Sequence, residues 1–213
     1  MLREALFGAQ EHKATLDNYD GEGAPPARDL AKEALVSVLN GEAPLIVTAN
    51  RAQDIASALR LKEEFKLTVW LDMAAEVYTL MDEVKAAGVP VLLHPTTYRA
   101  WDETKNLSFQ TAAKLADAGI PVAIQTGYEG YVPKVRVLVF EAAIAAAHGL
   151  GFKRTLESIT LTPSKLLGIS DRVGSIEVGK DGDLALFDGD PFEYTTHCTG
   201  VVIEGEVTSR AVR

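Results

Sequence analysis

The sequence has almost no cysteine and no long apolar run. Its single cysteine, Cys198, cannot form an internal disulfide, says little about the compartment, and is expected to be an incidental thiol at a strand edge. A stretch of about 18 apolar residues, which a membrane-spanning helix needs, is missing. Residues 1–19 carry too many charges for a signal peptide. We therefore expect a soluble, cytoplasmic chain without a membrane partner.

Positive charge is also in short supply. The chain has 21 Lys and Arg against 30 Asp and Glu, a net charge of −9. The acidic residues are spread along the chain, which argues against a nucleic-acid partner. The 213 residues are 47% hydrophobic and 24% charged, which is ordinary for a globular protein with one sizeable core.

Short apolar strands alternate with helical patterns in the middle of the chain. Strands are predicted at residues 45–47, 67–71, 89–93 and 122–124, and helices at residues 52–65, 75–87, 109–118 and 135–148. This alternation predicts an α/β fold with a parallel sheet. Four such βα units are half of a TIM-type barrel, which has eight strands.

Different patterns flank this predicted half-barrel, which we place at residues 44–168. Residues 1–43 form a helical lead-in, with helices at 2–19 and about 30–40 separated by a Gly- and Pro-rich break. A helical stretch at 155–167 leads into a small β-module at residues 169–213. Two hairpins are predicted in this module, pairing residues 173–178 with 184–187 and residues 201–203 with 206–209.

Three motifs carry a family resemblance. Residues 175–192 read Ser-Ile-Glu-Val-Gly-Lys-Asp-Gly-Asp-Leu-Ala-Leu-Phe-Asp-Gly-Asp-Pro-Phe, residues 161–168 read Leu-Thr-Pro-Ser-Lys-Leu-Leu-Gly, and residues 50–55 read Asn-Arg-Ala-Gln-Asp-Ile. Together they resemble the carboxy-terminal half of the metal-dependent amidohydrolase superfamily, and look closest to its imidazolonepropionase-like and prolidase-like members. The resemblance implies that the four predicted strands correspond to barrel strands five to eight.

The resemblance also implies where metal ligands should lie. The first position, normally His, holds Thr48. The second position is normally a His that lies three residues before a Glu. Glu76 matches that Glu, and Met73 occupies the position of the His. The third, an Asp that follows a Gln-Thr or similar pair, holds Gly127. Hydroxyl, thioether and glycine are poor replacements for His and Asp as ligands of a divalent ion. We therefore expect no metal in this chain, although the family would use zinc or another divalent metal.

Other polar residues could form a replacement site at the carboxyl ends of the strands. Asp72 ends the second predicted strand and His94 the third, and a His near a carboxylate could perform general acid/base catalysis. The alternative is that His94 is a hydrogen-bonded loop residue. His148 is expected at a helix C-terminus, as a favourable cation.

The loops after the strands define a possible pocket on the same side of the sheet. Aromatic residues in these loops either line a pocket or partner interface or cover the open end of the barrel; they are Tyr98, Trp101, Tyr128 and Tyr131. The expected pocket residues are Thr48, Asn50, Arg51, Met73, Glu76, Thr126, Gly127 and Tyr128.

An open half-barrel leaves two strand edges and one side of its core uncovered, which favours association. The alternative is that the sequence is a fragment of a longer product. The leading hypothesis is an amidohydrolase-like pseudoenzyme that acts as a structural or binding subunit. It would form a homo-oligomer or pair with a homologous chain that retains the metal ligands. The alternative is a hydrolase of carbon–nitrogen bonds in small amides, cyclic amides or dipeptides, with ligands completed by another chain. A third hypothesis is a domain that binds a ligand in the old pocket without turnover.

Overall fold

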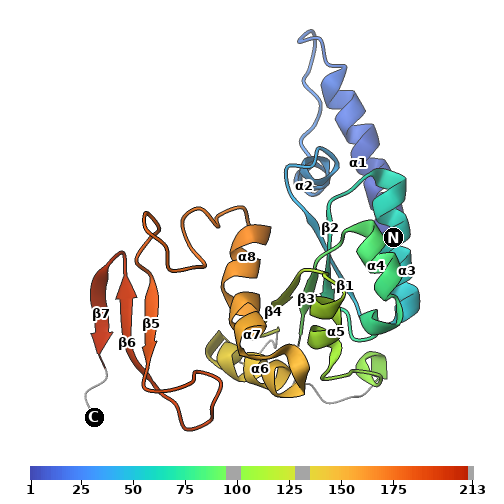
Figure 1. Ribbon diagram of the computed structural model, residues 1–213. Helices are drawn as coiled ribbons and strands as arrows, with labels where there is room; N and C mark the ends of the chain where they lie inside the picture. Colours follow the sequence, from blue (N-terminus) through green and yellow to red (C-terminus); the bar gives the residue numbers. More distant parts are fainter. Residues whose placement is uncertain (95–101, 128–134, 211–213) are drawn as a thin grey trace.

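A computed structural model describes residues 1–94, 102–127 and 135–210 of the chain (Figure 1). It shows a four-stranded parallel sheet with helices, and a separate three-stranded antiparallel sheet at the C-terminal end. The predicted α/β class with a small C-terminal β-module is confirmed.

The parallel sheet has its strands in sequence order. The strands are β1 (Leu45–Ala49), β2 (Val69–Met73), β3 (Val91–Leu93) and β4 (Val122–Ile124). The helices between them are α3 (Ala52–Phe65), α4 (Met81–Ala87) and α5 (Thr111–Asp117). Short 3₁₀ turns, η1 (Val77–Thr79) and η2 (Asp102–Thr104), precede α4 and α5. The helix predicted at 75–87 is therefore split into η1 and α4.

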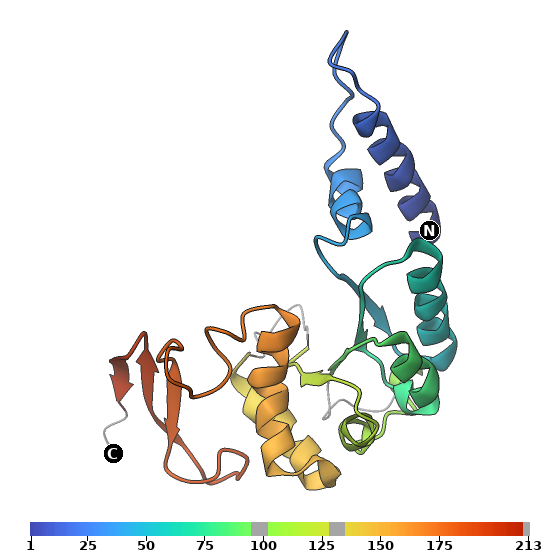
Figure 2. The same ribbon diagram turned by 45° about the horizontal axis from the view of Figure 1, so that its top comes forward.

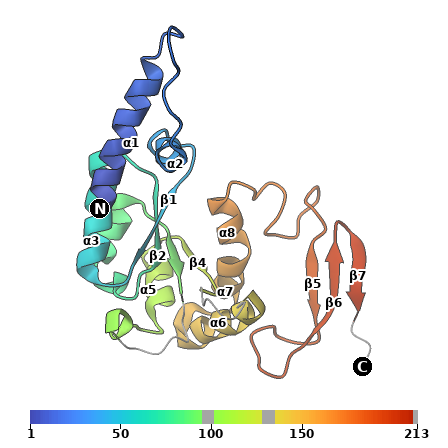
Figure 3. The same ribbon diagram turned by 180° about the vertical axis from the view of Figure 1, so that it is seen from behind.

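The core lies between the sheet and the helices α3, α4 and α5, which gather on one side of it in Figures 1 and 3. Side chains alternate between the two faces of a strand. Those that face the helices are almost fully buried, among them Val69, Leu71 and Val91. On the opposite face Ile46 remains 53% exposed. We call the face that carries Ile46 the open face.

Two helices form an arm at the N-terminal end, α1 (Leu2–Asp17) and α2 (Leu30–Leu39), and the turn between them points away from the rest of the chain (Figure 2). The α1 helix is fixed to α3 by an ion pair of 2.6 Å between Arg3 and Glu64. Beside it, Phe7 packs edge-to-face on Phe65. No helix in the described ranges is long and apolar enough to cross a membrane.

The chain after β4 forms a group of short helices. They are η3 (Val135–Val137), α6 (Leu138–Ala145), the π turn η4 (Ala146–Leu150), α7 (Phe152–Ile159) and α8 (Leu161–Leu166). The helix predicted at 155–167 is broken at Thr160, because Pro163 has no N–H to donate to the carbonyl of Ile159. His148 lies in the last turn of η4, the helix C-terminal position that was predicted for it. The centre of its ring is 4.9 Å from the centre of the Phe109 ring.

The C-terminal sheet consists of β5 (Leu184–Phe187), β6 (Cys198–Ile203) and β7 (Glu206–Arg210), in that order. The hairpin predicted between residues 201–203 and 206–209 is confirmed as β6 and β7. Gly200 is the one residue of the three strands that is buried. This small sheet therefore has little core of its own.

The other predicted hairpin is wrong, because residues 173–178 form no strand and β5 pairs with β6 instead. The backbone N–H of Asp181 donates to the carbonyl of Arg172 at 2.8 Å, and the two side chains form an ion pair of 2.6 Å. Gly174 lies so close to α8 that a Cβ there would meet the Ser164 hydroxyl at 2.2 Å. The segment is therefore a closed surface loop fastened to α8.

Candidate functional site

The carboxyl ends of the parallel strands bring three polar side chains together. The Thr48 hydroxyl, on β1, donates to Oδ2 of Asp72 on β2 at 2.6 Å. The Gln125 side-chain amide, directly after β4, donates to Oδ1 of the same carboxylate and to the carbonyl of Leu92 on β3 at 3.3 Å. The hydrogen bonds therefore connect all four strands across the open face. We call these three side chains the Asp72 bridge.

The bridge engages both oxygens of the Asp72 carboxylate with neutral donors. Within the described ranges, Asp72 accepts hydrogen bonds from Thr48 and Gln125. These bonds occupy both oxygens of the Asp72 carboxylate, and the acid/base pair of Asp72 and His94 proposed from the sequence stays a prediction. Sequence reasoning did not include Gln125 in the site. Its position, two residues beyond Ala123 and so on the same face of β4, was the available signal.

His94 and Gly127 make the tightest contact at this end of the sheet. Gly127 has a positive φ of 69°, and a Cβ added there would lie 1.7 Å from Nε2 and 1.8 Å from Cε1 of the His94 imidazole. The His94 side chain is 96% buried, since its exposed fraction is only 4%. The imidazole therefore fills the space in which any side chain at position 127 would begin.

The turn after β2 has an unusual backbone. Met73 and Ala74 have φ values of 66° and 51°, in a region that residues with a side chain rarely adopt. Asn50 holds this turn from β1: its side-chain oxygen accepts from the Ala75 N–H at 3.4 Å, and its carbonyl accepts from the Glu76 N–H at 2.9 Å. Two consecutive residues of this kind indicate strain maintained by the surrounding structure.

Glu76 connects the same turn to the start of α3. Its carboxylate accepts hydrogen bonds from the backbone N–H of Ala52, the first residue of α3, at 2.8 Å and from the Asn106 amide at 2.5 Å. These two bonds, the backbone one first, lower the pKa of the Glu76 carboxyl below its usual range. A carboxylate is stabilised at a helix N-terminus by the free N–H groups and the helix dipole. Glu76 therefore acts as a helix cap supplied by a different loop.

The remaining expected pocket residues are more exposed. Arg51 forms a solvent-exposed ion pair of 3.2 Å with Asp102. Thr126 is half-buried between Gln125 and Gly127. The expected aromatic residues lie outside the described residues: Tyr98, Trp101, Tyr128 and Tyr131.

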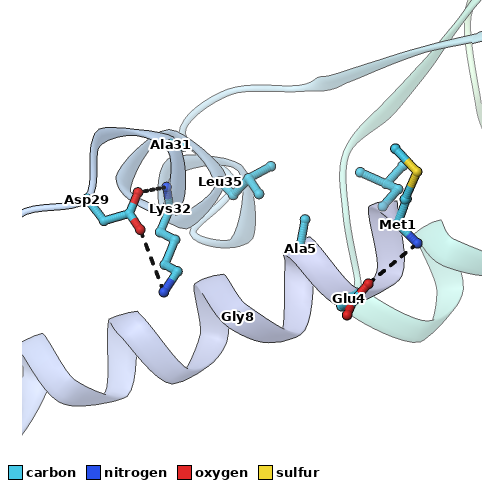
Figure 4. Close-up of a pocket in the computed structure, with 9 residues that line it drawn as sticks. Met1, Glu4, Ala5, Gly8, Asp29, Ala31, Lys32 and Leu35 are labelled. Atoms are coloured by element: carbon cyan, nitrogen blue, oxygen red, sulfur yellow. Dashed lines mark hydrogen bonds and ion pairs between the residues drawn. The ribbon is translucent and has the colours of Figure 1, made fainter.

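A groove of about 580 Å³ lies elsewhere, between α1 and α2 (Figure 4). It is open and mostly apolar, and two exposed ion pairs border it, Asp29 with Lys32 at 3.6 Å and the N-terminal amine with Glu4 at 3.9 Å. None of its lining residues comes from the strand ends. It has no part in the Asp72 bridge.

The donor set at the strand ends can be compared with what a divalent ion requires. Across residues 1–94, 102–127 and 135–210, no group of three or more His, Cys, Asp and Glu side chains is placed to hold a metal ion. The side chains that do converge are a hydroxyl, an amide and one carboxylate, and they are bonded to each other. Zinc in proteins is bound mainly by His, Cys and carboxylate ligands, so this set does not fit it.

Comparison with known proteins agrees with these features. A model of the amidohydrolase family matches residues 7–209. Over 95 residues the chain is 35% identical to the imidazolonepropionase of Fusobacterium nucleatum subsp. nucleatum, covering 44% of this chain and 23% of that protein. Over 131 residues it is 28% identical to the imidazolonepropionase of Thermoplasma acidophilum, covering 61% of this chain and 31% of that protein.

A crystal structure of an amidohydrolase from Thermotoga maritima MSB8 superposes on nearly the whole chain. The TM-score is 0.90 and the identity 30%, over 99% of this chain and 55% of that one. The chain thus spans about half the length of this structure, and the matched regions span less than a third of the two imidazolonepropionases.

Proposed function

The chain belongs to the amidohydrolase family, and from that premise we propose that it has lost the metal-dependent hydrolytic site and serves as a structural or binding subunit. The observation that carries this proposal is the contact between His94 and Gly127. By the motif resemblance, position 127 corresponds to the Asp ligand of the family, and here the His94 imidazole takes the place in which that side chain would start. At position 127, therefore, glycine stands in place of the Asp, and the His94 ring fills the space that an Asp side chain would need.

The other two ligand positions support the same conclusion. At position 48 a hydroxyl replaces an imidazole, and its proton is donated to Asp72 at 2.6 Å. At position 73 a thioether replaces an imidazole, and thioethers favour soft ions such as Cu(I) over zinc or manganese. Glu76, which the family motif retains, is used here to cap α3.

A binding or structural role also agrees with the surfaces left uncovered. The strands β1 and β4 are the outer strands of the parallel sheet, and Ile46 on the open face is half exposed. Outer strands with free backbone groups favour pairing with further strands. The subunit would therefore associate with itself or with a homologous chain.

The test is metal binding by the purified 213-residue chain. We expect elemental analysis to find no stoichiometric zinc, iron or manganese, and calorimetric titration with zinc to show no tight site. The matched control is the double variant Asp72→Ala/His94→Ala, which should behave like the wild type in both measurements. Tight, stoichiometric zinc that the double variant loses would overturn the proposal.

A second candidate function is hydrolysis of carbon–nitrogen bonds in small or cyclic amides. It is favoured by the 35% identity to an imidazolonepropionase over 95 residues. In that case the ligands absent here would come from another chain. Turnover of a cyclic amide that appears only when a homologous chain is added, and is lost in Asp72→Ala/His94→Ala, would establish this candidate in place of the first.

A further inference from the structure

The open face is the side of the parallel sheet that α3, α4 and α5 do not cover; β1 and β4 border it (Figure 1), and β4 also contacts α6, α7 and α8. The strands β1 and β4 each have a single neighbour among the described strands, β2 and β3 respectively. On the open face, the apolar Ile46 lies opposite the half-buried Trp70 in the register of β1 and β2. A parallel sheet is ordinarily covered on both faces. Here α3, α4 and α5 cover one face only (Figures 1 and 3).

The strand number and direction define what could complete this surface. A βα barrel closes with eight parallel strands, and the described part of this chain supplies four, all parallel. A two-fold axis along the strand direction would place β4 of each copy beside β1 of the other. Both new pairings would be parallel, and no strand edge would remain. Two-fold dimers are also the commonest closed assembly.

The polar groups of the open face permit such an association. Asp72 is held by Thr48 and Gln125 of its own chain. It therefore enters a barrel interior with its hydrogen bonds already made, which limits the cost of burying it. Ile46 and Trp70 would contribute apolar contacts to the new interior.

In the Thermotoga maritima structure, further chain accompanies the part that superposes on this chain. The chain covers 55% of that structure at a TM-score of 0.90, so the sheet has the curvature of the larger fold. The part of that structure left over is nearly as long as the part matched. A second copy of this chain would occupy a comparable volume.

We propose that two copies of this chain associate through the open face and pair β4 with β1 to close an eight-stranded barrel. This proposal rests on the proposed structural role and specifies its surface and partner. The barrel interior would be formed equally by the two copies. Both Asp72 bridges would lie at the same end of it, because all strands run in the same direction.

The experiment compares the solution mass of the 213-residue chain and of two variants by light scattering after size exclusion. The wild type should have twice the mass of one 22.9 kDa chain. Ile46→Lys places a charge in the proposed interface and should reduce the mass to that of one chain. The matched control is Val207→Lys on β7, because Val207 is 50% exposed and Ile46 is 53% exposed. This control should remain dimeric.

Hydrogen exchange gives a second measurement that does not depend on a variant folding. Backbone amides of β1 that are free in one copy should become protected when the protein concentration is raised from below to above the dissociation constant. A wild type that is monomeric at all concentrations, or whose mass keeps increasing with concentration, would overturn the proposal. A Val207→Lys variant that is monomeric while Ile46→Lys remains dimeric would also overturn the proposal, because it would place the interface at the C-terminal sheet.

The measurement of solution mass and the metal-binding test of the proposed function can each fail without the other. A dimer that holds tight zinc would refute the loss of the metal site and leave the interface intact. A metal-free monomer would refute the interface alone.

Discussion

The two faces of the parallel sheet differ in how their side chains are stabilised. On the face covered by α3, α4 and α5, Leu71 and Val91 are completely buried among aliphatic side chains. On the open face, Thr48, Asp72 and Gln125 are bonded to one another across the strands, and Ile46 is half exposed. One face is a hydrophobic core, and the other depends on a few polar contacts. The fold is therefore maintained mainly by the covered face, and the polar contacts lie at the strand ends of the open face.

The largest expected effect is the loss of a buried side chain from the covered face. Leu71→Ala removes a fully buried side chain, and we expect a decrease of about 4 kcal/mol in the free energy of unfolding. Ile46→Ala, on the open face of the neighbouring strand, should cost less than about 1 kcal/mol in the monomer. Urea denaturation of both variants measures the contrast. Equal losses would mean that the two faces are equally buried in solution.

The second prediction concerns the contact between His94 and Gly127. Gly127→Ala places a Cβ on the imidazole and also forces Ala into a positive φ, so we expect a loss of about 2 kcal/mol. In the background His94→Ala, the same substitution should cost only the backbone part, about 1 kcal/mol. A double-mutant cycle by denaturation measures this coupling. Additive effects would show that the ring does not fill this space.

The third prediction tests the Asp72 bridge. Asp72→Ala removes the acceptor of two hydrogen bonds and should destabilise the sheet by about 1.5 kcal/mol. Asp72→Asn keeps one oxygen for Gln125 and can donate to the Thr48 hydroxyl, so it should cost less than about 0.5 kcal/mol. Thermal unfolding distinguishes the two variants. An equally large loss in Asp72→Asn would show that the charge, rather than the bonding pattern, is required.

The smallest expected effect depends on pH and concerns Glu76. The folded pKa of this carboxyl is lower than its unfolded value, about 4.3 for an ordinary Glu. The contribution of the ionised Glu76 carboxylate to the free energy of unfolding is therefore complete above the unfolded pKa. This contribution is lost as the pH falls through the folded pKa. Glu76→Gln should be about 1 kcal/mol less stable than wild type at pH 7, with the difference disappearing in acid. A difference that persists unchanged at pH 2 would exclude this titration as its cause.

The covered face was predictable because burial determines which residues it contains. Runs such as Val91–Leu93 and Val122–Ile124 are apolar on every residue, and the sequence places both strands close to where the structure has them. The second strand was predicted at 67–71, two residues before β2. A displacement of two residues leaves the same side chains facing the core, because they alternate along the strand.

The open face was not predictable to the same degree, because its contacts join residues far apart in sequence. Asp72 meets Thr48 across 24 residues and Gln125 across 53. The family resemblance predicts that positions 48, 73 and 127 correspond to ligand positions of the family. It could not indicate that His94 fills the space at Gly127, since that depends on the register of two separate strands. The hairpin at 173–178 failed for a related reason, because its alternating apolar residues form a loop closed by Arg172 and Asp181.

The left-handed turn at Met73 and Ala74 also bears on how such a chain can evolve. Asn50 holds the backbone of this turn whatever side chain stands at position 73, so an imidazole could be regained there by substitution alone. At position 127 the same is not true, because a carboxylate is excluded until His94 is replaced. Under the proposed loss of the metal site, a return to metal binding requires that His94 be replaced before a carboxylate is introduced at position 127. Under the same proposal, this epistasis makes the loss of the site easier to acquire than to reverse.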